Sequence, residues 1–482
     1  MLSKKEALDK CLEIYNDYRA PEQRRLARID AALHPALDSE GMPKPRLELP
    51  EDAPPLLHQL AAEAETNYLA LLLETYSQTM HVDSYITKSD AGGKDPWDTW
   101  QRNRMDSRQV SLHRSALAYS AAYASAIPGI TDAGEDLAAV RLYTPKSMTA
   151  LYQDEEWDDW PVWAVSFTST HWTLIGDSEV HIFGREKTAP PTGANLSAYA
   201  GDRHLVYIQP SEHDLGVTPV VRYRDRHYLP GDKMLGIVEP LLPIQRRIDR
   251  TSANQMIAQQ IAIFKQKYSI GWVPDSEEEE IKASIAKVLY LDRDPSEVQL
   301  GEWSATDIDP YINAGNQARR DFAATGQIPA QAMGIDGISN ISDATLAGLE
   351  AAKNRRAGLI TTSLGESHEQ LMRLFATIDG NTAAAQDYGS EVVWRDFEAR
   401  SFAQSVDGLV KLVGIGLPAD IAMEDVPGMS GQRLKRIQAA MRVSRGREIL
   451  QAALDRQSSA QAQQPNATPV SPQSQADELE EK

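Results

Sequence analysis

The stretch that decides the fold runs from Ser342 to Ile378 and reads SDATLAGLEAAKNRRAGLITTSLGESHEQLMRLFATI. Its apolar residues recur at helical spacing, which predicts a single helix about 55 Å long if it is straight. Ser342 is the expected N-cap, with Asp343 in the first turn, where the helix dipole favours an acid. The glycines at positions 348, 358 and 365 predict bends.

Two more helical patterns precede this stretch, from residue 237 to 267 and from Tyr311 to Thr325. In the first, Ile237, Leu241, Ile244 and Ile248 are spaced by four, three and four residues, so one face packs. Residues 268–310, between the two patterns, predict a compact α/β unit. It has a strand at Tyr268–Val273, a helix near Glu277–Lys287 and a strand at Val288–Leu291.

The first 130 residues predict amphipathic helices at Lys4–Leu33, Leu56–Gln78 and Trp97–Ser125. From Val140 the period changes to about two, which predicts an antiparallel sheet. The expected strands are Arg141–Tyr143, Val162–Phe167, Trp172–Ile175, Val180–Phe183, Leu205–Ile208 and Val217–Tyr223.

The C-terminal part predicts a strand at Glu391–Arg395 and helices at Phe402–Gly414 and Gly431–Leu454. Residues 457–482 are rich in Gln, Ser, Ala and Pro with an acidic end, which predicts a disordered tail. The fold class expected from the whole pattern is α+β.

Composition excludes several classes of protein. The chain has 482 residues, an apolar share of 42% and a net charge of −20, so it has enough apolar residues for two or three cores and disfavours a tight grip on nucleic acid. Its single cysteine, Cys11, excludes an intrachain disulfide and a thiolate metal cage, and we expect it to be buried or half-buried. The sequence has neither a signal-peptide pattern nor an apolar run long enough for a membrane span, so we expect a soluble protein that is not secreted.

Catalytic motifs are missing. The glycines before Lys94 lack the spacing and hydroxyl of a phosphate-binding loop, so an ATPase built on such a loop is excluded. His368 and Glu369 begin like a zinc-protease helix, but Met372 replaces the second histidine, and we interpret this segment as a surface helix. No nucleophile elbow occurs. We therefore expect no catalytic residue, metal or cofactor.

One segment favours a rival interpretation. Asp154–Trp172 contains five acidic residues and four tryptophans, the residue types that a carbohydrate-active hydrolase uses. Consecutive carboxylates in a loop are equally typical of a solvated surface, and the tryptophans fit alternating strand positions in a sheet core. Oligomeric state would separate this alternative from a structural assembly.

The order of elements, together with several sequence strings, resembles the portal proteins of tailed bacteriophages, in particular those of long-tailed phages of actinobacteria. The resemblance covers about residues 10–455, and a second proline that is frequent in the family after Ile-Pro is Ala330 here. The strings that carry it are Gly236–Trp272, Thr325–Pro329, Met333–Gly334, Asn340–Glu350, Leu364–Leu374, Val392–Phe397 and Ser405–Pro418.

The resemblance implies a portal-type architecture. Its parts are a helix-rich wing with an antiparallel sheet, a two-helix stem, a small α/β clip, a long bent wing helix and a helical crown. The implied bounds are wing 1–236, stem helix one 237–267, clip 268–310, stem helix two 311–326, tunnel loop 327–341, long wing helix and strand 342–400, crown helices 401–456 and disordered tail 457–482.

The function that the resemblance implies is a dodecameric ring at one capsid vertex of the virion, through which double-stranded DNA is packaged and later leaves into the tail. The implied partners are further copies of the chain, the terminase large subunit, a head–tail adaptor, and the major capsid and scaffolding proteins. DNA would pass without sequence specificity and no membrane would be involved. The protein would be made in the bacterial host cytoplasm.

Three groups of residues become candidate sites. Residues 244–267 hold five basic residues and one acid, whereas residues 268–310 hold eleven acids and three basic residues. Such a contrast suits a channel that DNA slides through. The candidates are the tunnel loop (Gly334, Asp336, Gly337, Ser339, Asn340), the stem basic belt (Arg246, Arg247, Arg250, Lys265, Lys267) and the clip docking face (Glu277, Glu278, Glu279, Glu280).

Each group also has an ordinary structural interpretation. The belt arginines could pair with neighbouring acids or solvate a helix. The four glutamates could be a solvated helix start that the dipole favours. The loop could be a plain connection between two helices.

Overall fold

The computed structural model describes residues 2–462 apart from 36, 38, 40, 42–43, 45–46, 48, 51, 88–92, 131–133, 135, 188–196, 201–202, 264–266, 271–298, 303–306, 336–342, 397–401, 424–425 and 427–430. The chain divides into two compact units, Met1–Ala399 and Arg400–Lys482. The first unit mixes helices and sheets, whereas the described part of the second is helical.

The N-terminal helical run is confirmed. It consists of α1 (Lys4–Glu13), one π-helical segment (Ile14–Arg19) and α2 (Ala20–Leu33). Ser3 caps α1 by accepting a hydrogen bond from the Glu6 amide, while the Glu6 carboxylate accepts from the Ser3 amide. Cys11 is fully buried, as expected, in a cluster that joins α1 to a sheet, and burial raises the pKa of its thiol.

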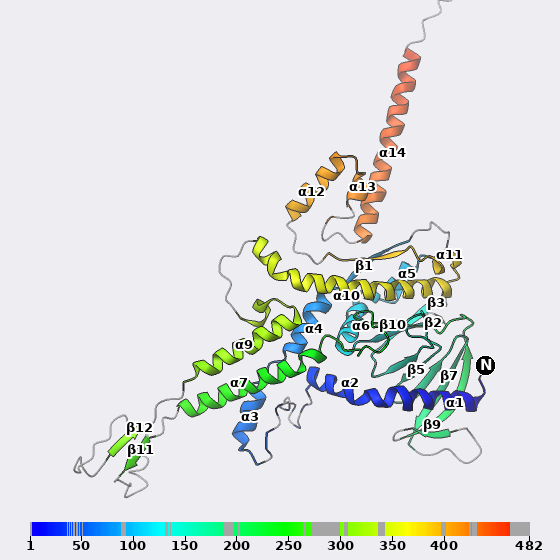
Figure 1. The fold of residues 1–482 in the computed structure, drawn as a ribbon. Helices are drawn as coiled ribbons and strands as arrows, with labels where there is room; N and C mark the ends of the chain where they lie inside the picture. Colours follow the sequence, from blue (N-terminus) through cyan, green and yellow to red (C-terminus); the bar gives the residue numbers. More distant parts are fainter. Residues whose placement is uncertain are drawn as a thin grey trace, which may run out of the picture. The chain divides into compact units, whose positions relative to one another are not determined.

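Six antiparallel strands form the larger sheet (Figure 1), in the order β4-β5-β6-β7-β9-β8. All of its neighbours are antiparallel, for example Trp172 opposite Phe183. The predicted antiparallel sheet is therefore confirmed. The bounds are β4 Met148–Leu151, β5 Trp163–Phe167, β6 His171–Ile175, β7 Glu179–Glu186, β8 Ser197–Ala200 and β9 Arg203–Glu212.

A second, three-stranded sheet has the order β10-β2-β3, with β2 Ala122–Ile130, β3 Asp136–Tyr143 and β10 Val220–Tyr223. The prediction of a helix through Ser125 is wrong, because α6 (Met105–Tyr119) ends in Ser120 at φ +70° and β2 follows. The run Ala-Tyr-Ala-Ser-Ala suits a helix by propensity. Pairing with β3 on one side and β10 on the other outweighs that propensity.

The predicted helix over Leu56–Gln78 is split into α3 (Pro55–Glu63) and α4 (Tyr68–Thr79). Asn67 caps α4 by accepting from the Ala70 amide at 3.2 Å. A short strand, β1 (Val82–Ile86), pairs with β13 (Glu391–Trp394), and α5 (Pro96–Arg102) follows it. The strand at residues 391–394 was expected, whereas β1 was not.

The long helix is confirmed as α10 (Asp343–Ile378), which is continuous through all three of its glycines. It packs against α5, β10 and β13 and buries Ala357, Leu364 and Phe375 in the largest apolar cluster of the protein. A four-residue helix, α11 (Thr382–Ala385), follows it. This central position explains why the segment dominates the sequence pattern.

Helices α7 (Leu242–Ile263) and α9 (Asp309–Gly326) lie side by side (Figure 1). Beyond them, β11 (Lys267–Ile270) pairs with β12 (Gln299–Glu302). The first helix begins later than residue 237 because Pro240 and Pro243 disfavour helical backbone before them, and Glu239–Leu241 forms a 3-10 turn instead. It ends at Ile263, so Lys267 belongs to a strand.

The second unit contains α12 (Phe402–Gly414), α13 (Ala419–Ala422) and α14 (Gly431–Ala462). The bounds of α12 match the prediction. Helix α14 continues past Leu454 to Ala462, so the expected tail is wrong for residues 457–462, where Ala and Gln favour a helix. Residues 463–482 lie outside the described part.

Candidate functional site

The α7–α9 pair is fixed at its base by polar contacts to the N-terminal helices. The Gln245 side chain donates to the Thr66 carbonyl oxygen at 2.8 Å and accepts from the Tyr68 amide at 3.1 Å. It also donates to the buried Asp249 carboxylate at 2.8 Å. Ahead of α7, Glu239 is buried and accepts from Arg25 and Arg28 of α2. These bonds attach the base of the α7–α9 pair to the N-terminal helices and to the segment between α3 and α4.

Three of the five belt residues lie on the exposed surface of α7. Arg247 forms an ion pair with Asp321 of α9 at 2.5 Å. For this arginine, the alternative that the belt residues pair with neighbouring acids is therefore correct. Arg246 and Arg250 are exposed and form no ion pair with any described residue. Because their spacing is four residues, the two arginines share one side of the helix.

The remaining belt residues are separated from this group. Lys267 opens β11 rather than ending α7, and Lys265 lies outside the described residues. Of the five residues predicted to form the belt, the structure therefore places three arginines on α7 and one lysine at the start of β11. The acidic candidates Glu277, Glu278, Glu279 and Glu280 also lie outside the described residues, as do the expected helix and second strand around them.

A tight turn ends α9. Gln327 adopts φ +54°. The Tyr76 hydroxyl donates hydrogen bonds to the carbonyl oxygens of Gly326 and Gln327, at 3.0 and 3.1 Å. The Arg356 guanidinium of α10 donates to the Gly326 carbonyl at 3.0 Å and lies over the Tyr76 ring. A Cβ at Gly326 would come within 3.1 Å of Leu72, so this position requires a small residue.

The chain after this turn stays attached to the core up to Ile335. A short 3-10 helix, Ala330–Met333, ends in the buried Met333, and Ile328 before it and Ile335 after it are buried too. Gly334 has φ +71°, which favours glycine, and no neighbour lies near its Cβ direction. The other tunnel-loop candidates, Asp336, Gly337, Ser339 and Asn340, lie outside the described residues.

The prediction that His368 lies on a surface helix is wrong, because α10 is the central helix and His368 is fully buried. Its Nε2 lies 2.7 Å from His113 Nε2, and its Nδ1 lies 3.1 Å from the Tyr223 hydroxyl. Trp100 and Trp394 pack edge-on against the ring. The histidine holds three elements together in the core.

One arrangement of protons satisfies this histidine chain without any charge. The Met80 carbonyl can only accept, so His113 Nδ1 carries a proton and donates to it at 3.2 Å. His113 Nε2 then accepts from His368 Nε2–H, and His368 Nδ1 accepts from the Tyr223 hydroxyl. Burial lowers the pKa of His113 to about 3 and holds the pKa of His368 well below its usual value.

The Trp-rich acidic segment does not form a pair of catalytic carboxylates. Glu155 accepts from Arg224 at 2.6 Å and from Arg222 at 3.3 Å, while Asp158 accepts from two backbone amides. Trp172 is buried in the sheet core, as expected, whereas Trp157 is 82% exposed and lies in no strand. Glu155 and Asp158 therefore serve local structure.

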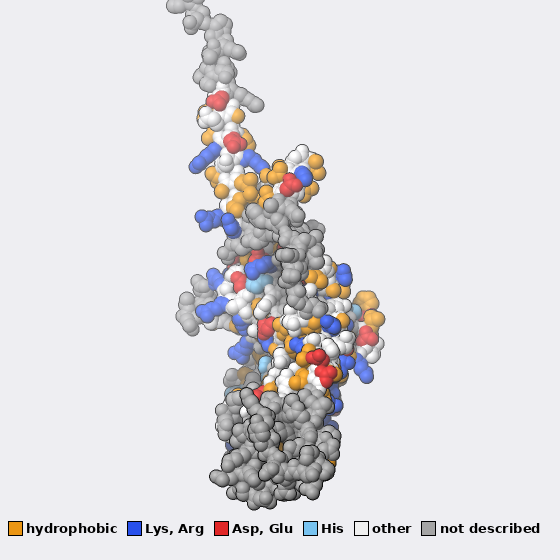
Figure 2. Space-filling model, turned by 90° about the vertical axis from the view of Figure 1, so that its left-hand side faces the viewer, with side chains coloured by type: hydrophobic (Ala, Val, Ile, Leu, Met, Phe, Trp, Pro, Cys, Tyr) orange, Lys and Arg blue, Asp and Glu red, His pale blue; other side chains and the backbone are white. Residues whose placement is uncertain are grey.

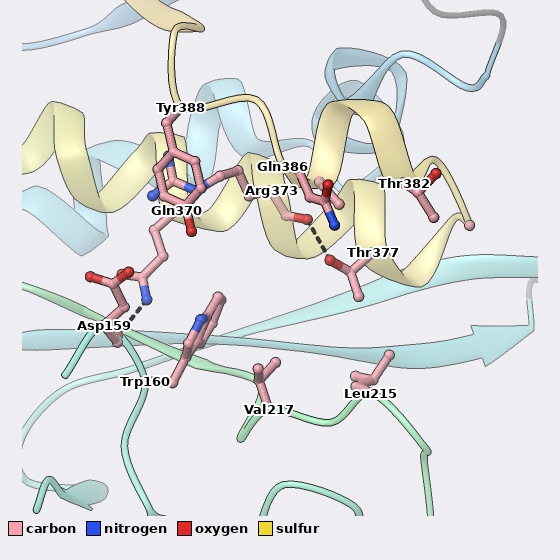
Figure 3. A pocket seen from close by; sticks show the side chains of 12 residues that line it. Asp159, Trp160, Leu215, Val217, Gln370, Arg373, Thr377, Thr382, Gln386 and Tyr388 are labelled. Atoms are coloured by element: carbon pink, nitrogen blue, oxygen red, sulfur yellow. Dashed lines mark hydrogen bonds between the residues drawn. The ribbon is translucent and has the colours of Figure 1, made fainter.

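A cleft of about 300 Å³ lies between α10, α11 and two loops (Figure 3). The Arg373 guanidinium lies 4.5 Å from the centre of the Tyr388 ring, and Gln370 donates to the Asp159 carbonyl at 2.5 Å. Across the described residues, no cluster of His, Cys, Asp or Glu could hold a metal ion. No helix within the described ranges is long and apolar enough to cross a membrane.

Comparison with known families identifies the class of protein. The family model for phage portal proteins of the SPP1 Gp6-like type matches residues 58–444. The chain therefore belongs to this portal protein family, which is a family of structural proteins rather than enzymes. A comparison with curated proteins finds no match.

The chain is similar in fold to chains in solved structures of gene transfer agent (GTA) particles. The neck of an empty particle, computed with C6 symmetry, is 13% identical, with a TM-score of 0.45 over 77% of this chain and 93% of that one. The neck of a native particle, computed with C12 symmetry, is 13% identical, with a TM-score of 0.44 over 84% and 98%. A native virion structure is 12% identical, with a TM-score of 0.42 over 74% and 87%.

Proposed function

We propose that twelve copies of the chain form a closed ring at one vertex of a phage-like capsid. The terminase pumps DNA in through the ring, and DNA later leaves through it into the tail. The observation that carries the proposal is membership of the portal protein family over residues 58–444. The likeness to portals of long-tailed actinobacterial phages belongs to the same proposal.

In this proposal the first 236 residues form the wing, α7 and α9 the stem, residues 268–310 the clip, and residues 401–456 the crown. The hydrogen bonds at the base of the α7–α9 pair support a stem role, because a channel wall must keep its position while DNA moves past it. Arg246 and Arg250 face the channel, where exposed cations attract phosphates weakly.

The turn at Gly326–Gln327 is the fixed root of the tunnel loop. Tyr76 and Arg356 hold its carbonyl oxygens, and three buried side chains hold the chain as far as Ile335. The loop residues Gly334, Asp336, Gly337, Ser339 and Asn340 then reach towards DNA from an immobile support. Glu277 to Glu280 form the docking face for the adaptor or the terminase. These roles extend the family assignment to particular residues.

The alternative of a carbohydrate-active hydrolase receives no support from the geometry, because Glu155 is committed to Arg222 and Arg224. The mass of the purified particle separates the two functions. A ring of twelve 53.3 kDa subunits has a mass of about 640 kDa. Mass photometry at 50, 150 and 500 mM KCl should find this particle, and a monomer under every condition would contradict the proposal.

A further inference from the structure

The C-terminal helix α14 is strongly basic, although the chain as a whole is acidic. Its 32 residues include seven basic and two acidic ones, a net charge of +5 within a chain of net −20. Helix α10, of 36 residues, carries four of each. The two acids of α14 balance the charge of only two of its seven basic residues, so the helix keeps a clear excess of positive charge.

The side chains of this helix are available to a partner. Arg436, Arg442 and Arg447 are exposed and make no ion pair with the described part of the chain. Figure 2 shows Lys and Arg side chains standing out from α14. At 100° per residue, Arg436 and Arg447 lie on one side and Arg442 lies more than 100° away from them. Positive charge therefore extends around the helix.

We propose that α14 binds the sugar–phosphate backbone of duplex DNA through these exposed arginines, without reading its sequence. The inference rests on the proposed function, which brings DNA to the ring. Duplex DNA carries about one negative charge per 1.7 Å along its axis, and α14 is about 48 Å long, so many phosphates can meet its cations. Lys and Arg side chains distributed along a helix are the electrostatic feature that a phosphate backbone attracts, and the extended charge of a duplex matches the extended charge of α14.

The test uses the full-length protein and a fluorescein-labelled 30-base-pair duplex, with binding followed by fluorescence anisotropy at 50 and 200 mM KCl. The variant is Arg436→Gln/Arg442→Gln/Arg447→Gln. The matched control is Lys5→Gln/Arg24→Gln/Lys233→Gln, which removes the same charge from exposed residues of the first unit that have no ion-pair partner among the described residues. The particle mass of each protein is measured in parallel.

We expect the α14 variant to keep its particle mass and to lose at least about 10-fold in DNA affinity at 50 mM KCl. Each phosphate that the variant no longer neutralises should reduce the steepness of log affinity against log salt by about 0.9. The control should stay within about 2-fold of the wild type. Unchanged affinity of the variant, or an equal loss in the control, would overturn the inference.

A changed particle mass in the α14 variant would also overturn it, because the arginines would then join copies of the chain or an acidic protein surface. The two measurements, particle mass and DNA affinity, separate a failure of this inference from a failure of the proposed function. A wild-type protein that forms no ring but binds DNA through α14 would refute the ring alone. A ring whose DNA affinity ignores the three arginines would refute the role of α14 alone.

Discussion

The buried histidine chain predicts that the first unit loses stability when the pH falls below about 6.5. In the folded protein both imidazoles are neutral, because burial holds the pKa of His113 at about 3 and that of His368 well below its usual value. In the unfolded chain both titrate near 6.5. Protons therefore bind the unfolded chain first, and the stability present above pH 6.5 decreases as the pH falls towards 3.

The size of the loss follows from this difference in pKa. Between pH 7.5 and 5.5, each histidine that stays neutral in the fold costs about 1.4 kcal/mol of unfolding free energy, so the pair costs about 2.7 kcal/mol. His368→Gln removes one titrating group and should reduce the pH-dependent loss by about 1.4 kcal/mol, whatever its effect on stability at pH 7.5. Replacing the exposed His227 by Gln should leave the loss unchanged.

Urea unfolding at pH 7.5 and 5.5 measures these losses. Tryptophan fluorescence reports on the site because Trp100 and Trp394 contact His368. The quantity compared is the difference in unfolding free energy between the two pH values for each protein. If His368→Gln lost as much stability as the wild type over this interval, the neutral histidine chain would be refuted.

Three further predictions concern the turn after α9, the proposed docking face and the proposed tunnel loop. Tyr76→Phe should lower the unfolding free energy by about 1–2 kcal/mol, because it removes the hydroxyl that the Gly326 and Gln327 carbonyls accept; a melting temperature equal to the wild type would contradict the role of this anchor. Replacing Glu277 to Glu280 by Lys should leave the particle mass unchanged but weaken a pull-down with the adaptor, since rim charges steer encounters; unchanged binding at low and physiological salt would favour a solvated helix start. Deleting Asp336–Ser339 should leave the mass and melting temperature nearly unchanged while packaging of DNA falls sharply; a full genome packaged at normal yield would show that the loop has no role in the tunnel.

Long, strongly periodic segments could be predicted from the sequence. The bounds of α10 and α12 follow from helical spacing alone, and four strands of the larger sheet, β5, β6, β7 and β9, follow from period-two patterns between turn residues. The short strands β4 and β8 of the same sheet were not expected. Residues 122–125 could not be assigned correctly, because small residues fit both helix and strand and distant pairing partners decide between them. His368 was misplaced for a similar reason, since its partners His113 and Tyr223 lie 255 and 145 residues away.

In the candidate site too, local sequence patterns could be predicted, whereas contacts between distant residues could not. The sequence pointed to Arg246, Arg247 and Arg250, which the structure places together on the surface of α7. It did not reveal the anchor of the turn after α9, because Tyr76 and Gly326 are 250 residues apart and no local pattern marks their contact. The glycine at 326 and the Ile-Pro that follows were the only available signals of a tight turn there.

The proposed assembly is a closed ring whose channel is lined by the α7–α9 pair. An electron cryomicroscopy map of the purified particle, reconstructed without imposed symmetry, tests it most directly. We expect a ring of twelve subunits with α7 and α9 around a central opening and with Arg246 and Arg250 facing it. A particle without a central channel, or a ring in which these two helices lie on the outer rim, would contradict the account.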